Sequence, residues 1–214
     1  MANKKDHIIV FIISSLLFLT GVFFGMLFSQ INVNEIKYKI NDFEQNINSL
    51  EMSLLINNAL KNETLSCNYL KGKLNETRAQ LKDLGDKVIN YESSAKIKDN
   101  DYKELKKNYL FARAKFWLML EKLRNECNNN YTTILFFYKT QTPCPECKDE
   151  GIILSHLSSH NKNLYVIPLD ADEDLLIIRI IKEAFKINYV PSIVINAKTK
   201  IEGLINETAL LRII

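Results

Sequence analysis

The chain has 214 residues, of which 47% are hydrophobic and 25% charged, and its net charge is +3 at neutral pH. Residues 131–214 carry nine Lys/Arg against ten Asp/Glu, so no basic surface there indicates nucleic acid as a partner. All four prolines lie after residue 142, which divides the chain into a long helical part and a compact part with turns.

An uncharged, mostly apolar stretch of 21 residues runs from Ile8 to Phe28. At about 1.5 Å per residue, a helix of this length spans the roughly 30 Å hydrocarbon core of a bilayer. No small-x-small cleavage site follows, which favours an anchor over a signal peptide. Lys4 and Lys5 precede the span, so we predict a cytoplasmic N-terminus and an extracytoplasmic C-terminal domain. Residues 1–30 are thus predicted to be a tail and a transmembrane anchor in contact with membrane lipid.

Residues 31–127 predict a coiled-coil stalk, because apolar residues recur there with the 3-4 spacing of heptads. One series covers Ile36–Leu54 and a second covers Cys67–Leu123, and the two differ by one residue in phase. The repeat therefore breaks near residues 55–66. Each series forms one narrow apolar seam, and a seam of this kind needs a partner helix.

Two arrangements can bury this seam. In a parallel homodimer, Asp101 and Lys106 form a favourable pair between chains, and Cys67 lies at an a position where it could cross-link them. In the alternative, the chain folds back on itself at the phase break. We expect the homodimer, with Cys67 as a small core residue. Around Phe116 and Trp117 the stalk is apolar on all sides, which predicts that it also docks on the compact part.

The pattern of residues 128–214 alternates between strand-like and helix-like runs in the order β-α-β-α-β-β-α. The expected elements are a strand at 131–139, a helix at 146–160, a strand at 164–169, a helix at 172–187, strands at 192–196 and 200–205, and a helix at 206–214.

Two cysteines, Cys144 and Cys147, stand at the turn from the first strand to the first helix. A Cys-x-x-Cys pair at this position, with Pro145 opening the helix, is typical of a thiol–disulfide redox centre. Zinc sites use the same spacing. A finger completed by His156 and His160 would have a loop of eight residues instead of about twelve, so we expect no metal.

This order of elements resembles the thioredoxin-like family over residues 132–211. The matching motifs are Thr142-Pro-Cys-Pro-Glu-Cys147 after the first strand and Tyr189-Val-Pro-Ser192 before the third. The resemblance implies an α/β fold class, with a C-terminal thioredoxin-like domain at 128–214. A transmembrane helix and a long coiled-coil helix would precede it.

Cys144 stands at the strand end and is the outer cysteine of the pair, so we expect it to attack as the nucleophile. Cys147, one turn further into the helix, should resolve the mixed disulfide. The resemblance implies in addition that the Val190–Pro191 bond is cis and lies against the disulfide, with Val190 accepting a substrate polypeptide. This chain departs from most thioredoxins because Pro143 replaces a Trp and the first strand lacks a buried acid.

The predicted function is a membrane-anchored thiol–disulfide oxidoreductase that exchanges disulfides with protein thiols and disulfides. It would need a second redox protein of unknown identity and no cofactor. The alternative is a non-catalytic coiled-coil membrane scaffold whose thioredoxin-like module only binds partners. We interpret Cys127 as a spacer cysteine, and exchange with the active pair is its alternative role.

Overall fold

The computed structural model of the chain describes residues 4–60, 63–94, 100–127 and 130–214. Three long helices come first in these residues: α1 (Lys4–Leu60), α2 (Glu63–Ser94) and α3 (Asn100–Cys127). The remaining elements follow in the order expected from the sequence. They are β1 (Thr132–Tyr138), α4 (Pro145–His160), β2 (Leu164–Asp170), α5 (Leu176–Ala184), β3 (Ser192–Ile195), β4 (Thr199–Glu202) and α6 (Glu207–Leu211).

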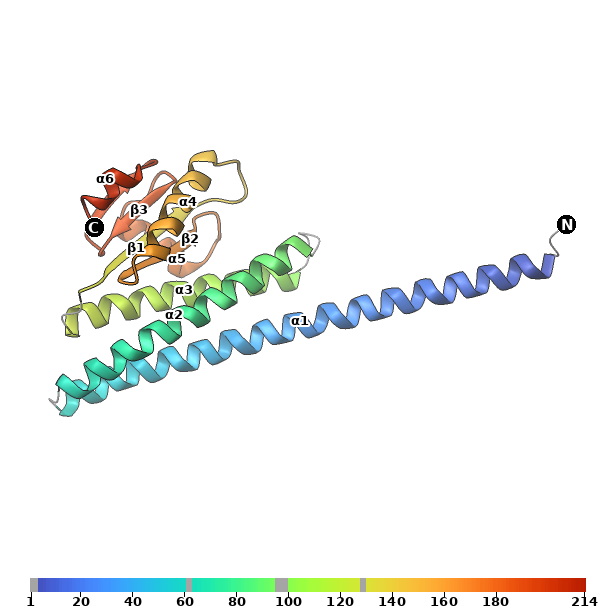
Figure 1. Cartoon of the computed structure of the whole chain (residues 1–214), viewed down its shortest axis with the longest axis horizontal. Helices are drawn as coiled ribbons and strands as arrows, with labels where there is room; N and C mark the ends of the chain where they lie inside the picture. Colours follow the sequence, from blue (N-terminus) through green and yellow to red (C-terminus); the bar gives the residue numbers. More distant parts are fainter. Residues whose placement is uncertain (1–3, 61–62, 95–99, 128–129) are drawn as a thin grey trace.

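The second half of α1 packs with α2 and α3 into an antiparallel bundle (Figure 1). Helix α1 ends at Leu60 and α2 begins at Glu63, inside the interval where the heptad phase shifts. Seam residues are buried between the helices of one chain, among them Ile36, Phe43, Leu54, Leu70, Leu74, Leu84, Leu105 and Phe116. The seam positions Ala95 and Lys98 lie outside the described residues. A homodimer through the stalk stays a prediction.

The fold class predicted from the sequence is wrong. In the described residues the protein is mostly helical with a small four-stranded sheet, and the expected single long helix at 31–127 is divided among three helices. The physical reason is that a heptad seam specifies burial but not the partner that provides it. Here the chain turns back and buries the seam against itself.

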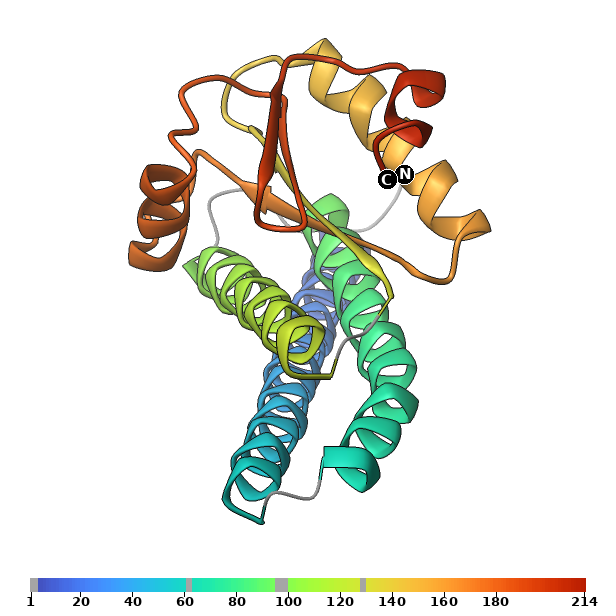
Figure 2. The ribbon, with the colours of Figure 1, turned by 90° about the vertical axis from the view of Figure 1, so that its left-hand side faces the viewer.

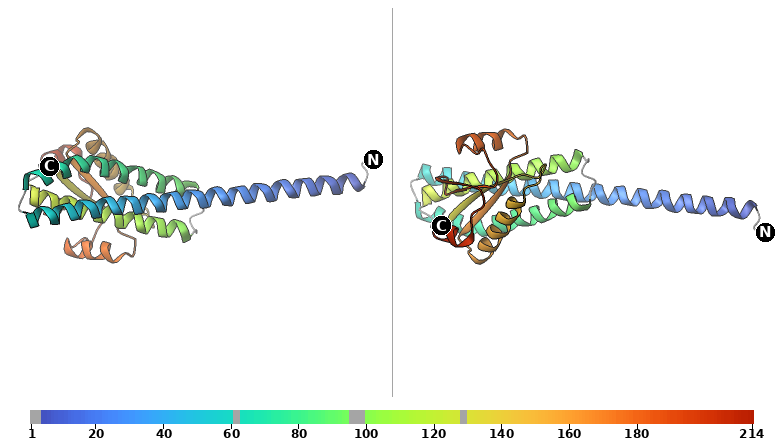
Figure 3. Two further views of the ribbon diagram at one scale, coloured as in Figure 1. Left: turned by 90° about the horizontal axis from the view of Figure 1, so that it is seen from below. Right: turned by 90° about the horizontal axis from the view of Figure 1, so that it is seen from above.

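The predicted transmembrane anchor is also contradicted. Among the described residues, no helix combines the length and apolarity that crossing a membrane requires. The single-pass localisation, with a cytoplasmic N-terminus and an extracytoplasmic C-terminal domain, therefore loses its support. Figure 3 shows the amino-terminal half of α1 extending beyond the bundle.

The sheet has the strand order β2-β1-β3-β4 in the described residues. Strand β1 pairs in parallel with β2, with Thr132 opposite Leu164, and antiparallel with β3, with Ile134 opposite Ile195. Strands β3 and β4 form an antiparallel hairpin. Pro168 lies in β2, an edge strand, where a residue without an N–H is tolerated.

Helices cover both faces of the sheet (Figure 2). Strand residues alternate between the faces, so Ile134 and Phe136 of β1 pack with α4 and α6. Leu135 and Phe137 point the other way and share a core with α5 and the helical bundle. The second face of the sheet is thus covered by the bundle together with α5.

Helix α3 makes this contact, as its all-round apolar composition predicts. The ring of Phe116 meets Tyr165 of β2 at 6.2 Å between centroids, and Trp117 meets Phe185 at 6.0 Å. Near the amino end of β1, the backbone oxygen of Asn196 accepts a hydrogen bond from Arg124 at 2.8 Å. The bundle and the sheet therefore form one continuous core.

Candidate redox site

Cys144 and Cys147 form a disulfide at the amino end of α4, with their Cα atoms 5.2 Å apart. Cys144 is the N-cap residue, and Pro145 takes the first helical position, where its missing N–H costs nothing. The backbone N–H of Cys147 points at the Cys144 sulfur, with 3.3 Å between N and Sγ. Once reduced, a thiolate at Cys144 would face this N–H and the positive end of the helix dipole.

The two sulfurs differ in exposure. Cys144 is partly exposed, whereas Cys147 is only 7% exposed and packs with the core between α4 and the sheet. A substrate can reach Cys144 and cannot reach Cys147 without moving that core. Of the two sulfurs, only that of Cys144 is therefore open to an incoming molecule.

The Val190–Pro191 segment lies against the disulfide. The peptide bond is cis, as the resemblance implies. The Cys144 sulfur lies 4.0 Å from the carbonyl oxygen of Val190. Pro191 is buried, while Tyr189 beside it is 70% exposed. The four residues singled out from the sequence, Cys144, Cys147, Val190 and Pro191, thus lie within one site.

Glu150 is a buried acid that sequence reasoning missed. It is fully buried one helical turn after Cys147. Its Oε2 accepts a hydrogen bond from the N–H of Ile205 at 2.9 Å, and its Oε1 has no partner among the described residues. Burial raises the pKa of Glu150, and the Ile205 N–H offsets only part of this effect. The 3-4-3 spacing of Cys147, Glu150, Leu154 and Leu157 is the signal that could have placed it on the buried face.

A second disulfide, Cys67–Cys127, was also missed by the sequence reasoning. It joins the first turns of α2 to the last turn of α3 across a sequence separation of 60 residues. Cys127 precedes the amino end of β1 and Cys144 follows its carboxyl end, and a seven-residue strand covers about 23 Å. Direct exchange between Cys127 and the active pair is therefore excluded in this arrangement. An even number of cysteines was the available signal.

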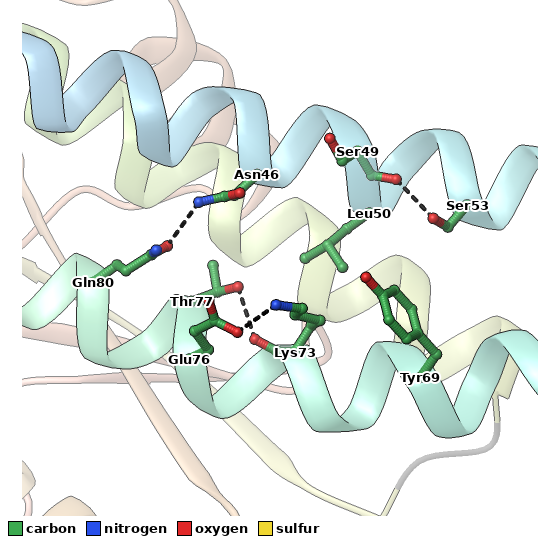
Figure 4. Close-up of a pocket in the computed structure, with 9 residues that line it drawn as sticks. All are labelled: Asn46, Ser49, Leu50, Ser53, Tyr69, Lys73, Glu76, Thr77 and Gln80. Carbon is green, nitrogen blue, oxygen red and sulfur yellow. Dashed lines mark hydrogen bonds and ion pairs between the residues drawn. The ribbon is translucent and has the colours of Figure 1, made fainter.

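His156 and a cleft in the helical bundle lie apart from this site. His156 is exposed on α4, where its Nδ1 lies 3.3 Å from Glu207 Oε1. A cleft of about 220 Å³ lies between α1 and α2 (Figure 4). Its polar groups bond to one another, as Asn46 does to Gln80 at 3.2 Å, and no cysteine is among its described lining residues.

No family model and no curated protein matches this chain. Among solved structures, a chloroplastic thioredoxin z is similar, with 20% sequence identity and a TM-score of 0.34. The match covers 44% of this chain and 84% of that chain. This similarity is low and concerns the fold alone.

Proposed function

We propose that the protein is a thiol–disulfide oxidoreductase that exchanges disulfides with protein substrates through Cys144 and Cys147. The observation that carries the proposal is the environment of one sulfur. The partly exposed Cys144 Sγ caps α4, is bonded to a buried cysteine, and lies 4.0 Å from the carbonyl oxygen of Val190.

The proposed reaction needs only the two thiols. In the reduced protein, the Cys144 thiolate attacks a substrate disulfide, forms a mixed disulfide and releases one substrate thiolate, which takes a proton. The Cys147 thiolate then attacks Cys144 Sγ and releases the second substrate thiol. Two electrons pass from the pair to the substrate, and the reverse sequence oxidises a substrate dithiol. A second redox protein would restore the starting form of the pair.

Substrate binding is proposed at the Val190–Pro191 segment. The backbone of Val190 lies beside the reactive sulfur, so a polypeptide that pairs with it would bring its own sulfur close to Cys144. The exposed ring of Tyr189 adds apolar area next to this position. Proteins, not small thiols, are thus the proposed substrates.

An insulin-reduction assay with dithiothreitol as electron donor tests the proposal. We expect the full chain to accelerate insulin precipitation and the Cys144→Ser variant to lose this effect at least tenfold, because serine forms no thiolate. The matched control is the double variant Cys67→Ser, Cys127→Ser, which leaves the active pair intact and should retain activity. Equal rates for the full chain and Cys144→Ser would favour the non-catalytic partner-binding alternative.

A further inference from the structure

We propose that Lys106, which belongs to the helical bundle, is a positioning residue for the redox pair. It holds the segment that leads into Cys144 by binding that segment and the carboxylates beneath it. This inference rests on the proposed function, because it concerns the reactivity of the same cysteine. It adds that the bundle is a working part of the redox site.

Lys106 is a largely buried lysine that lies beside two carboxylates. Its Nζ lies 2.6 Å from Asp170 Oδ2 and 2.9 Å from Glu173 Oε1. Its side chain is only 14% exposed, and that of Asp170 is completely buried. Burial alone would lower the pKa of Lys106, but hydrogen bonds and charges from the two carboxylates outweigh it and raise the pKa. Lys106 therefore forms a buried ion pair that links α3 to the end of β2.

Lys106 also contacts the redox loop, the segment of residues 140–143 that leads into Cys144. Lys106 Nζ donates to Thr140 Oγ1 at 3.1 Å, and Thr140 Oγ1 donates to Asp170 Oδ2 at 2.7 Å. The backbone N–H groups of Thr140 and Gln141 both donate to Asp172 Oδ2, at 3.1 and 2.9 Å. Thr140 stands four residues before Cys144. The redox loop is thus held by Asp170 at the end of β2, by Asp172 just after that strand, and by Lys106 of the bundle.

The positive charge of Lys106 also offsets negative charge at the end of β2. Asp170, Asp172 and Glu173 place three carboxylates at the carboxyl end of β2. Lys106 contacts two of them, while Lys182 of α5 donates to the carbonyl oxygen of Ala171 at 3.0 Å. Without the Lys106 charge, this end of the sheet becomes more negative and Thr140 loses a partner. Both changes disfavour a thiolate at Cys144, the first through charge and the second by loosening the helix cap that stabilises it.

The test measures alkylation of Cys144 in the full chain with its Cys144–Cys147 pair reduced. The rate constant for iodoacetamide is recorded from pH 5 to 9, and labelling at Cys144 is identified by peptide mass. Lys106→Met should move the profile to higher pH and lower the rate at pH 7 by about threefold to tenfold, since the rate follows the thiolate fraction. Lys106→Arg, which keeps the charge, should stay within about twofold of the parent.

The matched control is Lys87→Met, which removes a bundle lysine that contacts Glu35 at 2.6 Å and makes no contact with the redox loop in the described residues. It should leave the profile unchanged. Thr140→Val removes the hydrogen bond between the redox loop and Lys106, should shift the profile in the same direction as Lys106→Met, and serves as the test if that variant does not fold. An unchanged profile in either folded variant overturns the positioning role. A chain that shows the Lys106 dependence but does not reduce insulin would instead contradict the proposed function alone.

Discussion

Cys144 and Cys147 belong to the same helical turn but meet opposite environments. Cys144 lies at the exposed helix start, where negative charge is favoured, and Cys147 lies in the core between α4 and the sheet. An asymmetric pair of this kind separates attack from resolution. The roles predicted for the two residues, attack by Cys144 and resolution by Cys147, stay predictions that an alkylation experiment can test.

Glu150 gives a prediction about stability and pH. Its pKa in the folded protein lies above the 4.5 of an ordinary glutamate, so folding favours the protonated form. The stability that this preference contributes is fully present below about pH 4.5 and is lost as pH rises through the folded pKa. We expect Glu150→Gln, which cannot ionise, to be more stable than the parent at pH 7, with the difference shrinking towards pH 4.

Urea unfolding at a series of pH values measures this difference. Glu146→Gln is the matched control, because Glu146 lies on the same helix but is exposed. If the free energy of unfolding changed with pH in the same way for the parent and for Glu150→Gln, burial would not disfavour the Glu150 carboxylate. The comparison also indicates whether the unpartnered Oε1 atom carries a proton at neutral pH.

At the residue scale, the sequence predicted what a motif contains and missed what the fold assembles. Cys144, Cys147 and Pro191 belong to short patterns with a known chemistry, and the structure places them close together. Lys106 and Asp170 are 64 positions apart, and their pairing depends on how α3 docks on β2. The heptad pattern instead predicts an interchain pair between Lys106 and Asp101, because a heptad repeat indicates contacts between helices and carries no information about a sheet.

Gly85 tests the helix packing at the element scale. A Cβ atom at this position would lie 2.2 Å from the hydroxyl oxygen of Tyr109, which reaches from α3 to donate to Leu81 of α2 at 3.4 Å. Gly85→Ala should therefore push the two helices apart and lower the free energy of unfolding by about 1–3 kcal/mol. Urea unfolding followed by helical circular dichroism measures this loss.

Gly72 on the same helix is the matched control, since a Cβ there meets no atom within 4 Å. Gly72→Ala should raise stability by about 0.5–1 kcal/mol, because alanine restricts the unfolded chain and favours the helix. If the two substitutions changed stability in the same direction, the close approach of α2 and α3 at Gly85 would be wrong.

The helices themselves were predictable, and their partners were not. The phase break at 55–66 contains both the end of α1 at Leu60 and the start of α2 at Glu63, so a defect in the repeat marked the end of an element. Whether the seam pairs with the same chain or another depends on the turn, and turn geometry has little signature in a heptad pattern. The docking of α3 was predictable because one seam cannot account for apolar residues on every side.

On the scale of the whole molecule, the bundle and the sheet act as one body. They share a hydrophobic core, and charged side chains of α3 reach both ends of β1. The Cys67–Cys127 disulfide closes the bundle next to the sheet. In the chain-entropy account, a cross-link over about 60 residues stabilises the fold by roughly 4 kcal/mol. We therefore infer a structural role for it, in contrast to the pair at the start of α4, where Cys144 is partly exposed.

The two disulfides also differ in their electrostatic surroundings. A thiolate at Cys144 would meet the positive end of α4, whereas one at Cys127 would meet the negative end of α3. Its partner Cys67 lies in the first turns of α2, so the helix ends do not act in one direction on the second pair. Reduction of the second pair also gives up the cross-link between α2 and α3, and we therefore expect it to be the harder of the two to reduce. The two pairs should therefore respond to different redox conditions in the same folded protein.

A redox titration of the folded full chain tests this requirement most directly. The protein is equilibrated in glutathione buffers of increasing reducing strength, the free thiols are trapped by alkylation, and each labelled cysteine is identified by peptide mass. We predict that Cys144 and Cys147 become labelled at a less reducing potential than Cys67 and Cys127, which stay bonded while the fold persists. If Cys67 and Cys127 open first, or if Cys144 and Cys147 are labelled only on unfolding, the redox assignment is contradicted.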